Sequence, residues 1–432
     1  MLRTRARRLT AAGTALLMAA GGTIAAASPA RAAGGTTRIS SSSAGVAGNA
    51  VSEAPWVTAD GRYVGFSSSA DNLVPNQTNF TEDVFVRDQL TGATERVSVA
   101  TDGTQAQYPS ARPRISADGR YVVFDSFAPN LVPGDTNGLT DVFLRDRQTR
   151  TTTRLSVSAT GQQSNGSSYW ASISPDARYV AYTSDATNLV PGASSGYANV
   201  YLLDRHTGSL TVVSKSAAGV LGDGNSQTPV VSADGRYVAF ESQADNLVAG
   251  DTNNAMDVFV KDMTTGAVQR VSVTNSGQQF DAGGSTGDGV DMAMSADARY
   301  VTFVGQTTNT NAQLYVRDRV KNTTTLVSVG ADGKPGDYAT YEGSISPNGR
   351  YVAFDTGSTN IVPGSPPYFN SYVRDLLTGT TTLVSVTWTG APITESTGEL
   401  AMSNVGVCFQ SYADNVVQDT VGRTGQIYFH AL

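Results

Sequence analysis

The sequence predicts an all-β fold, a seven-bladed β-propeller of four-stranded antiparallel blades, on the strength of two observations. The first is a repeat. The motif Ser-Ala-Asp-Gly-Arg-Tyr-Val-Val-Phe at 116–124 returns in close copies at a nearly regular spacing, and the copies end at Phe66, Phe124, Tyr182, Phe240, Phe303, Phe354 and Phe409. The second is that each repeat holds four short strand-like runs and no helical period. Repeats of this kind are typical of propellers, whose blades surround a central channel.

Blade 2 illustrates the four strands expected in each repeat. The run 113–116 is followed by Asp118-Gly119, a strong hairpin signal between two apolar runs. The second run, 120–124, is almost continuously apolar, so we expect it to be buried on both faces. A polar loop then separates it from two further predicted strands, an alternating run at 141–146 and a threonine-rich run at 151–158.

The two ends of the chain predict how the ring closes. Arg38, Arg96 and Arg154 are equally spaced along the chain, at the period of the repeat, so the run at 36–40 corresponds to a fourth strand. The seventh repeat ends after its third strand, at 426–429. We therefore expect the N-terminal strand to complete the last blade, which leaves no exposed edge. We expect residues 33–432 to form one domain.

The segment 1–32 differs in composition from the rest of the chain. Arg3, Arg5, Arg7 and Arg8 precede an apolar run, and Ala30-Arg31-Ala32 follows it. This order is typical of a secretory signal peptide with its cleavage site. We expect residues 1–32 to be removed and the mature chain to be secreted, either extracellular or periplasmic, without membrane insertion. A membrane anchor is the alternative.

Charge and cysteine content restrict the classes of partner and of bond. The segment 1–32 contains five of the 30 basic residues and no acid, so 25 basic and 37 acidic residues remain, a net charge near −12. This excess of acid argues against nucleic acid as a partner. The single Cys408 rules out an internal disulfide, and its apolar surroundings predict a buried thiol.

The repeat also resembles a known family. The motif Asp-Gly-Arg-Tyr-Val-x-Phe followed by Asp-Val-Phe-Val-Arg-Asp, as at 60–66 and 83–88, resembles the WD-like repeat of TolB-type propellers over the whole of residues 33–432. The resemblance implies a protein-binding platform. TolB itself has a small α/β domain and six blades, whereas this sequence shows seven repeats. The family also includes propellers joined to peptidases and lyase-type propellers.

Chain direction predicts where a binding site lies. In a four-stranded meander, the tight turns lie on one face, and the loops between strands 2 and 3 and between blades lie on the other. We call the second face the long-loop face, and binding usually resides on such loops. Residues repeated in every blade, such as Arg62 and Asp88 with their counterparts, are expected to form ion pairs of the scaffold. Residues that break the repeat are the candidates for function.

The binding candidates are aromatic and acidic residues expected at long-loop positions. They are Tyr169, Trp170, Tyr341, Glu342 and Trp388, together with Asp281, Asp288 and Asp291 in the enlarged connection 279–292. Aromatic side chains of this kind anchor peptides or stack on sugars, although they also cap strand ends. Acids in an insertion bind a cation or a basic partner, or are simply solvated. The main hypothesis is a monomeric, non-enzymatic platform for a protein or an extracellular glycan.

Two loops carry oxygen donors at a spacing that suits calcium. The candidate ligands are Asp135, Asn137 and Asp141 in blade 2 and Asp251, Asn253 and Asp257 in blade 4. The loops lack the full ligand series of an EF-hand, and ordinary turn chemistry is the alternative. No other cofactor is expected.

Enzymatic hypotheses are narrowed by elimination, and no catalytic residue is assigned. His206 and His430 are the only histidines, too few for a multi-histidine metal centre, and no Gly-x-Ser-x-Gly motif occurs. The surviving alternative is a carbohydrate-active propeller that uses Glu342, Glu395 and Glu399 at the channel mouth. Two close carboxylates beside aromatic residues would favour this alternative, whereas an apolar or aromatic patch with scattered acids would favour binding alone. The sequence does not identify the ligand.

Overall fold

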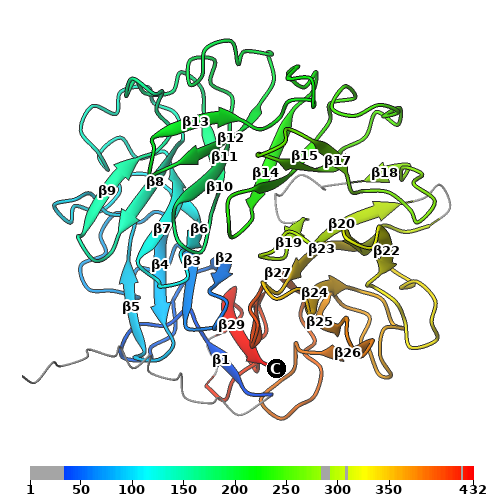
Figure 1. The fold of residues 1–432 in the computed structure, drawn as a ribbon. Coiled ribbons are helices and arrows are strands. Elements are labelled where there is room, and N and C mark those ends of the chain that lie inside the picture. The colour runs from blue at the N-terminus through cyan, green and yellow to red at the C-terminus, as the bar shows by residue number, and fades with distance from the viewer. Residues whose placement is uncertain (1–33, 284–291, 307–309, 420–421) are drawn as a thin grey trace, which may run out of the picture. The chain divides into compact units, whose positions relative to one another are not determined.

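Seven antiparallel sheets follow one another around a ring, in the order of the sequence (Figure 1). A computed structural model describes residues 34–283, 292–306, 310–419 and 422–432, which belong to one compact unit, Arg31–Leu432. The described residues contain strands and turns and no helix. In this part of the chain, then, no helix has the length and apolar character needed to cross a membrane. The all-β, seven-bladed prediction is confirmed.

Each blade has four strands, numbered here from the channel outward. The innermost strands are β2 (Ser52–Val57), β6 (Ser110–Ile115), β10 (Ser168–Ile173), β14 (Ser226–Val231), β19 (Ala293–Met294), β23 (Thr340–Ile345) and β27 (Thr397–Met402). The second strands are β3 (Tyr63–Ser68), β7 (Tyr121–Ser126), β11 (Tyr179–Ser184), β15 (Tyr237–Ser242), β20 (Tyr300–Gln306), β24 (Tyr351–Thr356) and β28 (Gly406–Ser411). In blade 5 a further short strand, β18 (Ala282–Gly283), also pairs with β20.

The two outer strands complete each sheet. The third strands are β4 (Asp83–Asp88), β8 (Asp141–Asp146), β12 (Asn199–Asp204), β16 (Asp257–Asp262), β21 (Gln313–Asp318), β25 (Asn370–Asp375) and β29 (Gln426–Ala431). The fourth strands are β5 (Ala93–Arg96), β9 (Thr151–Arg154), β13 (Ser209–Val212), β17 (Val268–Arg270), β22 (Thr323–Leu326), β26 (Thr380–Leu383) and β1 (Thr36–Arg38).

The ring closes as the sequence predicts. The N-terminal strand β1 pairs antiparallel with β29, with Thr37 opposite Phe429, and so becomes the fourth strand of blade 7. Figure 1 shows the first and last strands side by side in one sheet. Buried side chains of both ends, such as Ile39 and Ile427, share one core cluster with Val64 of blade 1. Closure therefore buries apolar surface as well as pairing an edge.

The repeated aromatic residues form the core of every blade. The ring that ends each motif stacks on an aromatic ring of the third strand, with centroids 5.5 to 5.8 Å apart in all seven blades, as for Phe124 and Phe143. The motif glycine is needed where blades meet. Gly119 has φ 73°, and a Cβ atom there would lie 2.4 Å from the ring of Tyr63 in blade 1.

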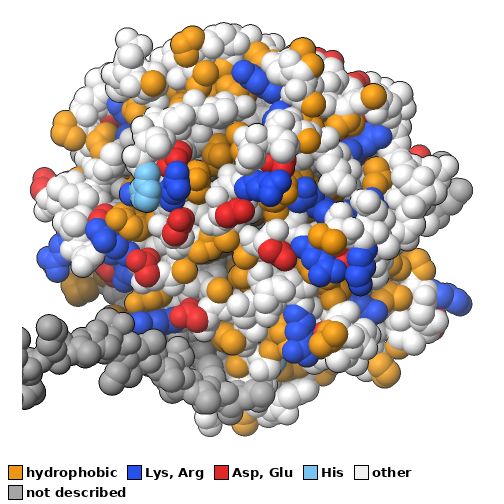
Figure 2. All heavy atoms as spheres, viewed as in Figure 1, with side chains coloured by type: hydrophobic (Ala, Val, Ile, Leu, Met, Phe, Trp, Pro, Cys, Tyr) orange, Lys and Arg blue, Asp and Glu red, His pale blue; other side chains and the backbone are white. Residues whose placement is uncertain are grey.

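The tight-turn face carries the repeated arginine and aspartate of each motif. In six blades the arginine after the turn pairs with the aspartate that ends the third strand, as in Arg120–Asp146 at 2.6 Å and Arg178–Asp204 at 2.8 Å. These contacts are within a blade, as predicted for scaffold residues. One face of the molecule is shown in Figure 2, where acidic and basic side chains lie side by side without a broad area of one sign.

Candidate functional site

The candidate site begins with a break in the innermost strands. In six blades the pairing between the first and second strands shifts register after the first or second residue, which is a β-bulge. The residue at the third position of the strand has a left-handed backbone in five of them, with φ of 50° to 55° at Ala54, Arg112, Trp170, Thr228 and Glu399. Such backbone is uncommon outside glycine, and bulges of this kind re-aim side chains next to functional sites.

The bulge turns neighbouring side chains toward the channel mouth instead of opposite faces of the sheet. In β10, the rings of Tyr169 and Trp170 contact each other edge to face, with centroids 4.9 Å apart. The same third position holds Arg112 in blade 2, Glu342 in blade 6 and Glu399 in blade 7. Unlike the tight-turn motif, this position therefore carries a different chemical group in most blades.

A cavity of about 680 Å³ lies at this mouth, over blades 7, 1, 2 and 3. Its lining includes Glu53, Ala54, Glu82, Arg112, Arg114, Asp125, Phe127, Tyr169, Trp170, Asp185 and Glu399. We call it the mouth pocket. A narrower space of about 150 Å³, lined mostly by apolar residues of the innermost strands of all seven blades, continues along the axis. Arg112, Arg114 and Trp170 line both spaces, so they form the floor of the mouth pocket.

Two carboxyl groups of blade 1 interact in the mouth pocket. Burial and the nearby charge of Glu53 together raise the pKa of Glu82 to about 7, although Arg112 acts in the opposite direction. Glu82 immediately precedes β4, whereas Glu53 lies in β2, so the sheet brings together two acids that are distant in the sequence. A carboxyl group that titrates near neutral pH beside a second carboxylate is suited to proton transfer.

The remaining charges of the pocket are held by specific contacts. Arg112 Nη1 donates to Asp125 Oδ2 at 2.8 Å, and burial raises the pKa of Asp125. The Glu399 carboxylate accepts a hydrogen bond from the Ala54 amide at 2.5 Å, which links blade 7 to blade 1. Tyr169 donates to Asp185 Oδ1 at 3.2 Å, and burial with that carboxylate raises the pKa of Tyr169 to about 12. These contacts hold the acidic side chains in fixed positions around the aromatic pair.

Blade 6 carries a second group of acidic and aromatic side chains. Burial raises the pKa of Asp355 to about 6, and Glu342 is one of its hydrogen-bond partners. Tyr341 is 41% exposed and stacks on Phe369, with centroids 6.0 Å apart. Neither Tyr341 nor Glu342 lines the mouth pocket as defined above.

The structure therefore brings together some of the predicted site residues and separates others. Tyr169, Trp170 and Glu399 line the mouth pocket, while Trp388 lies in the hairpin closed by the Val386–Pro392 bridge, is 60% exposed and lines neither space. Glu395 also lies apart, paired with Arg423 at 3.2 Å. Asp281 is described and precedes β18, whereas Asp288 and Asp291 lie outside the described residues.

One positional expectation was wrong. Glu342 and Glu399 were expected before the innermost strands, yet they lie within β23 and β27. Tyr169, Trp170 and Tyr341, which were expected at long-loop positions or their edges, lie at the second or third residue of β10 and β23. The bulge explains the difference, because it lets pairing resume beyond a residue that breaks the alternation of a strand. The residues missed from sequence are Glu53, Glu82, Arg112, Arg114, Asp125 and Asp185. The sequence does contain a signal for Arg112, because it occupies the same position in its repeat as the candidate Trp170. Ala54 and Thr228 occupy this position in blades 1 and 4.

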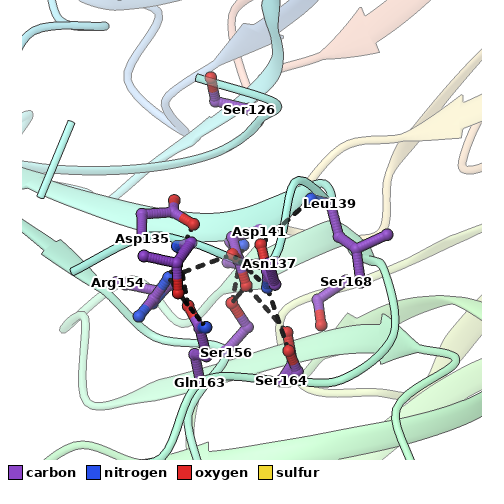
Figure 3. A network of polar contacts seen from close by, with 12 residues as sticks. Ser126, Asp135, Asn137, Leu139, Asp141, Arg154, Ser156, Gln163, Ser164 and Ser168 are labelled. Atoms are coloured by element: carbon purple, nitrogen blue, oxygen red, sulfur yellow. Dashed lines mark hydrogen bonds and ion pairs between the residues drawn. The ribbon is translucent and has the colours of Figure 1, made fainter. Parts of the chain in front are cut away.

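In blade 2, Arg154 of β9 lies between the carboxylates of the loop predicted to hold calcium (Figure 3). Arg154 Nη1 lies 3.0 Å from Asp135 and 3.4 Å from Asp141, while Asn137 donates to Asp141 Oδ2 at 3.2 Å. The arrangement returns in blade 4, where Arg270 lies 2.7 Å from Asp251 and 3.4 Å from Asp257. Over the described ranges, no group of three or more His, Cys, Asp or Glu side chains is placed to hold a metal. Calcium binding stays a hypothesis from the sequence, and the arginines between the carboxylates oppose it.

The two histidines lie in different blades. The backbone amide of His206 donates to Asp204 in the tight turn of blade 3, and His430 lies in β29, where Thr36 is its hydrogen-bond partner at 2.8 Å. Cys408 is buried in β28, as predicted.

Comparison with solved structures shows the propeller fold. TolB from Acinetobacter baumannii is 17% identical with a TM-score of 0.41, over 68% of this chain, which spans 57% of the length of that protein. Oligogalacturonate lyase from Vibrio parahaemolyticus is 13% identical with a TM-score of 0.54, over 91% of this chain and 92% of that one. The propeller domain of the Trilobed protease from Pyrococcus furiosus is 11% identical with a TM-score of 0.52, over 88% and 95%.

Neither the family profiles nor the curated proteins gave a match to the sequence. At the identities above, likeness to a solved structure shows the fold alone. The chain is a seven-bladed β-propeller.

Proposed function

We propose that this protein is a secreted glycan-binding propeller that holds a polyhydroxylated ligand in the mouth pocket. The observation that carries the proposal is the composition of that pocket. An aromatic pair, Tyr169 and Trp170, lies in the same cavity as carboxylates from several blades, and the cavity has a volume of about 680 Å³. Ligand sites in proteins typically measure about 300 to 1,000 Å³ and combine aromatic walls with a few fixed polar groups.

The chemistry of the lining suits sugars. Carboxylates accept hydrogen bonds from hydroxyl groups, and the pocket offers them at Glu53, Asp185 and Glu399. Aromatic rings provide flat apolar surface for the C–H faces of a sugar ring. Phe127, which is 44% exposed and packs edge to face on Tyr108, extends this aromatic surface along the rim. Because the backbone at the bulges is left-handed, the polar groups are held in place before a ligand arrives.

The test is a binding screen with a matched pair of tryptophan variants. Oligosaccharides from cell-wall and plant polysaccharides would be titrated into the protein by calorimetry. Trp170→Ala should weaken binding by roughly tenfold or more, since aromatic anchors dominate binding energy. Trp388→Ala removes an exposed tryptophan outside the pocket and should change affinity by less than about twofold. A screen in which no glycan binds, or in which only Trp388→Ala matters, would contradict the proposal.

A second candidate function is acid–base catalysis on the bound glycan. The observation that favours it is the interaction of Glu53 with Glu82, whose pKa is raised to about 7 by burial and by the Glu53 charge. A carboxyl group with a pKa of about 7 holds its proton in a large share of molecules at neutral pH and can donate it to a leaving group. Product analysis of the bound oligosaccharides tests this candidate. Glu82→Gln should abolish turnover and preserve binding, and absence of turnover in the wild type would leave a binding protein.

Protein binding on the same face, a monomeric state and secretion remain predictions from the sequence. Exposed aromatic residues of the long loops, Phe80, Tyr197 and Tyr368, are available to a protein partner. They are scattered over blades 1, 3 and 6, in contrast to the convergent residues of the mouth pocket. The glycan proposal therefore has the more specific structural support.

A further inference from the structure

Arg114 is half-buried at the floor of the mouth pocket. It lies in β6, two positions beyond Arg112 toward the tight-turn face, and it lines both the mouth pocket and the narrower space below. Its guanidinium lies 4.5 Å from the ring centroid of Trp56, and Nη1 donates to the Pro113 carbonyl at 3.0 Å. The stacking on Trp56 fixes the plane of the guanidinium group.

Several other arginines of the described chain have a terminal guanidinium nitrogen with a hydrogen-bond or ion-pair partner outside the adjacent residue. Arg145 Nη1 donates to the Ala100 carbonyl and to Thr152 Oγ1, and Arg154 pairs with two aspartates. Arg112, the neighbour of Arg114, pairs with Asp125 at 2.8 Å. Among the described residues, Arg114 takes part in no ion pair, and apart from the Pro113 carbonyl none supplies a hydrogen-bond acceptor to it.

The charges around Arg114 leave the floor of the pocket positive. Protein surrounds most of the Arg114 side chain, and this burial lowers its pKa to about 10, while Asp125 acts in the opposite direction. The group therefore remains protonated at neutral pH. The Asp125 charge is already balanced by Arg112. Arg114 therefore shares one carboxylate with a second arginine, and an anionic group of a ligand would supply the missing counter-charge.

We propose that Arg114 is an anion-recognition residue and that the glycan bound in the mouth pocket carries a carboxylate, as a uronic acid does. The inference rests on the proposed function, because it takes the ligand of the mouth pocket to be a glycan. A guanidinium group presents parallel N–H donors that match the two oxygens of a carboxylate. Glu53 and Glu399 line the mouth pocket but not the narrower space, so we assign them to the hydroxyl groups of the ligand and Arg114 to its acidic group.

The experiment compares each acidic oligosaccharide with its own neutral form. Glucuronate-, galacturonate- and mannuronate-containing oligosaccharides would be titrated into the purified protein, each beside the same oligosaccharide after reduction of its carboxyl groups to alcohols. The wild type should bind at least one acidic form roughly tenfold more tightly than its reduced form, the usual effect of a hydrogen bond to a charged group. Arg114→Gln should remove that preference and leave affinity for the reduced form within about twofold.

Two further variants keep the test interpretable. Arg150→Gln removes a positive charge from the tight turn of the same blade, just before β9, and should leave the preference intact. Arg114→Lys keeps the positive charge but lacks the planar pair of N–H donors of a guanidinium group, so it should show a reduced preference for the acidic form. It replaces Arg114→Gln if that variant does not fold. Circular dichroism and thermal melting of each variant establish that the propeller is intact.

The outcomes separate this inference from the proposed function. Equal or tighter binding of the reduced oligosaccharides by the wild type would overturn the role of Arg114 and leave glycan binding standing. Equal weakening of acidic and reduced forms by Arg114→Gln would also overturn it, because the residue would then only shape the pocket. If neither form of any oligosaccharide binds, both the inference and the proposed function fail.

Discussion

The two faces of the propeller use charged residues in opposite ways. On the tight-turn face, an arginine and an aspartate of the same blade pair in six blades with nearly the same geometry. At the mouth on the other face, the third residue of the innermost strand is Ala54, Arg112, Trp170, Thr228, Glu342 or Glu399, according to the blade. Residues that the scaffold needs are repeated, whereas residues that a ligand would contact differ around the ring.

The difference extends to energetics. The repeated pairs are partly exposed and satisfied within their own blade, which gives each a small stabilising effect. The mouth concentrates left-handed backbone, interacting carboxyl groups and a half-buried arginine without an ion pair, all of which are unfavourable for folding. Strain and destabilised charge in one place are typical of functional sites. The predictions below test this contrast, from the largest expected effect to the smallest.

Loss of a buried scaffold carboxylate should cost the most stability. Asp141 is fully buried and accepts hydrogen bonds from Ser156, Ser164 and Asn137, besides its contact with Arg154. Asp141→Ala should lower the free energy of unfolding by about 3 to 5 kcal/mol, because it leaves a buried arginine short of its counter-charge. Chemical denaturation measures the change. A loss below about 1 kcal/mol would show that the network is not a structural element.

Removal of the Glu82 carboxylate from the mouth pocket should instead raise the free energy of unfolding, and only at higher pH. The pKa of Glu82 is about 7 in the folded protein, above its ordinary value of 4.5. Between these two pKa values, Glu82 is mostly ionised in the unfolded chain but mostly protonated in the folded protein. The free energy of unfolding of the wild type therefore falls as the pH rises through this window. The loss is on the order of 2 to 3 kcal/mol. Glu82→Gln should therefore be more stable than the wild type at pH 8 and lose that advantage at pH 4.

The control for this prediction is Glu395→Gln. Glu395 lies outside the mouth pocket and pairs with the exposed Arg423. Denaturation midpoints of this variant should follow the wild type across the same pH range. A Glu82→Gln profile parallel to that of the wild type would contradict the unfavourable burial of Glu82.

The repeated pairs of the tight-turn face should matter less individually. Arg178 and Asp204 are 2.8 Å apart, and the arginine side chain is 37% exposed. Arg178→Gln should cost less than about 1 kcal/mol of stability, as measured for exposed ion pairs. It should also leave glycan affinity unchanged by calorimetry. Weakened binding in this variant would contradict the assignment of scaffold residues to the tight-turn face and of ligand contacts to the mouth, because it would place the ligand on the tight-turn face.

Calcium should have the smallest effect. In the calcium-candidate loops, the positive charge between the carboxylates already comes from Arg154 and Arg270. A bound cation would have to displace these guanidinium groups. We expect the thermal midpoint to be the same in millimolar calcium and in chelator, by scanning calorimetry. A rise in the midpoint with calcium would instead establish the loops as metal sites.

Much of the fold was predictable from the sequence because each repeat carries the same strand and turn signals. Seven copies of one motif predict seven blades, and the register of Arg38 with Arg96 and Arg154 predicts the strand that closes the ring. A local signal that is repeated is hard to misread. Tyr169 and Trp170 were also predicted as candidates, because they are aromatic residues that break the repeat. Glu399 was predicted as a carboxylate at the channel mouth.

The remaining site residues depend on geometry that the sequence does not state. Glu82 comes just before a third strand and Glu53 lies in a first strand, so only the pairing of the sheet brings them together. Arg114 has the ordinary alternation of a strand residue, and its exposure to the channel follows from the bulge at Arg112. Trp388 also breaks the repeat pattern, but it is exposed and lines neither the mouth pocket nor the narrower space, so its role in binding stays a prediction.

The most direct test of glycan binding in the mouth pocket is a crystal structure of the protein with the tightest-binding oligosaccharide from the screen. We expect sugar density in the mouth pocket, against Tyr169 and Trp170 and within hydrogen-bonding distance of Glu399. Density confined to the tight-turn face, or to the surface around Trp388, would contradict it.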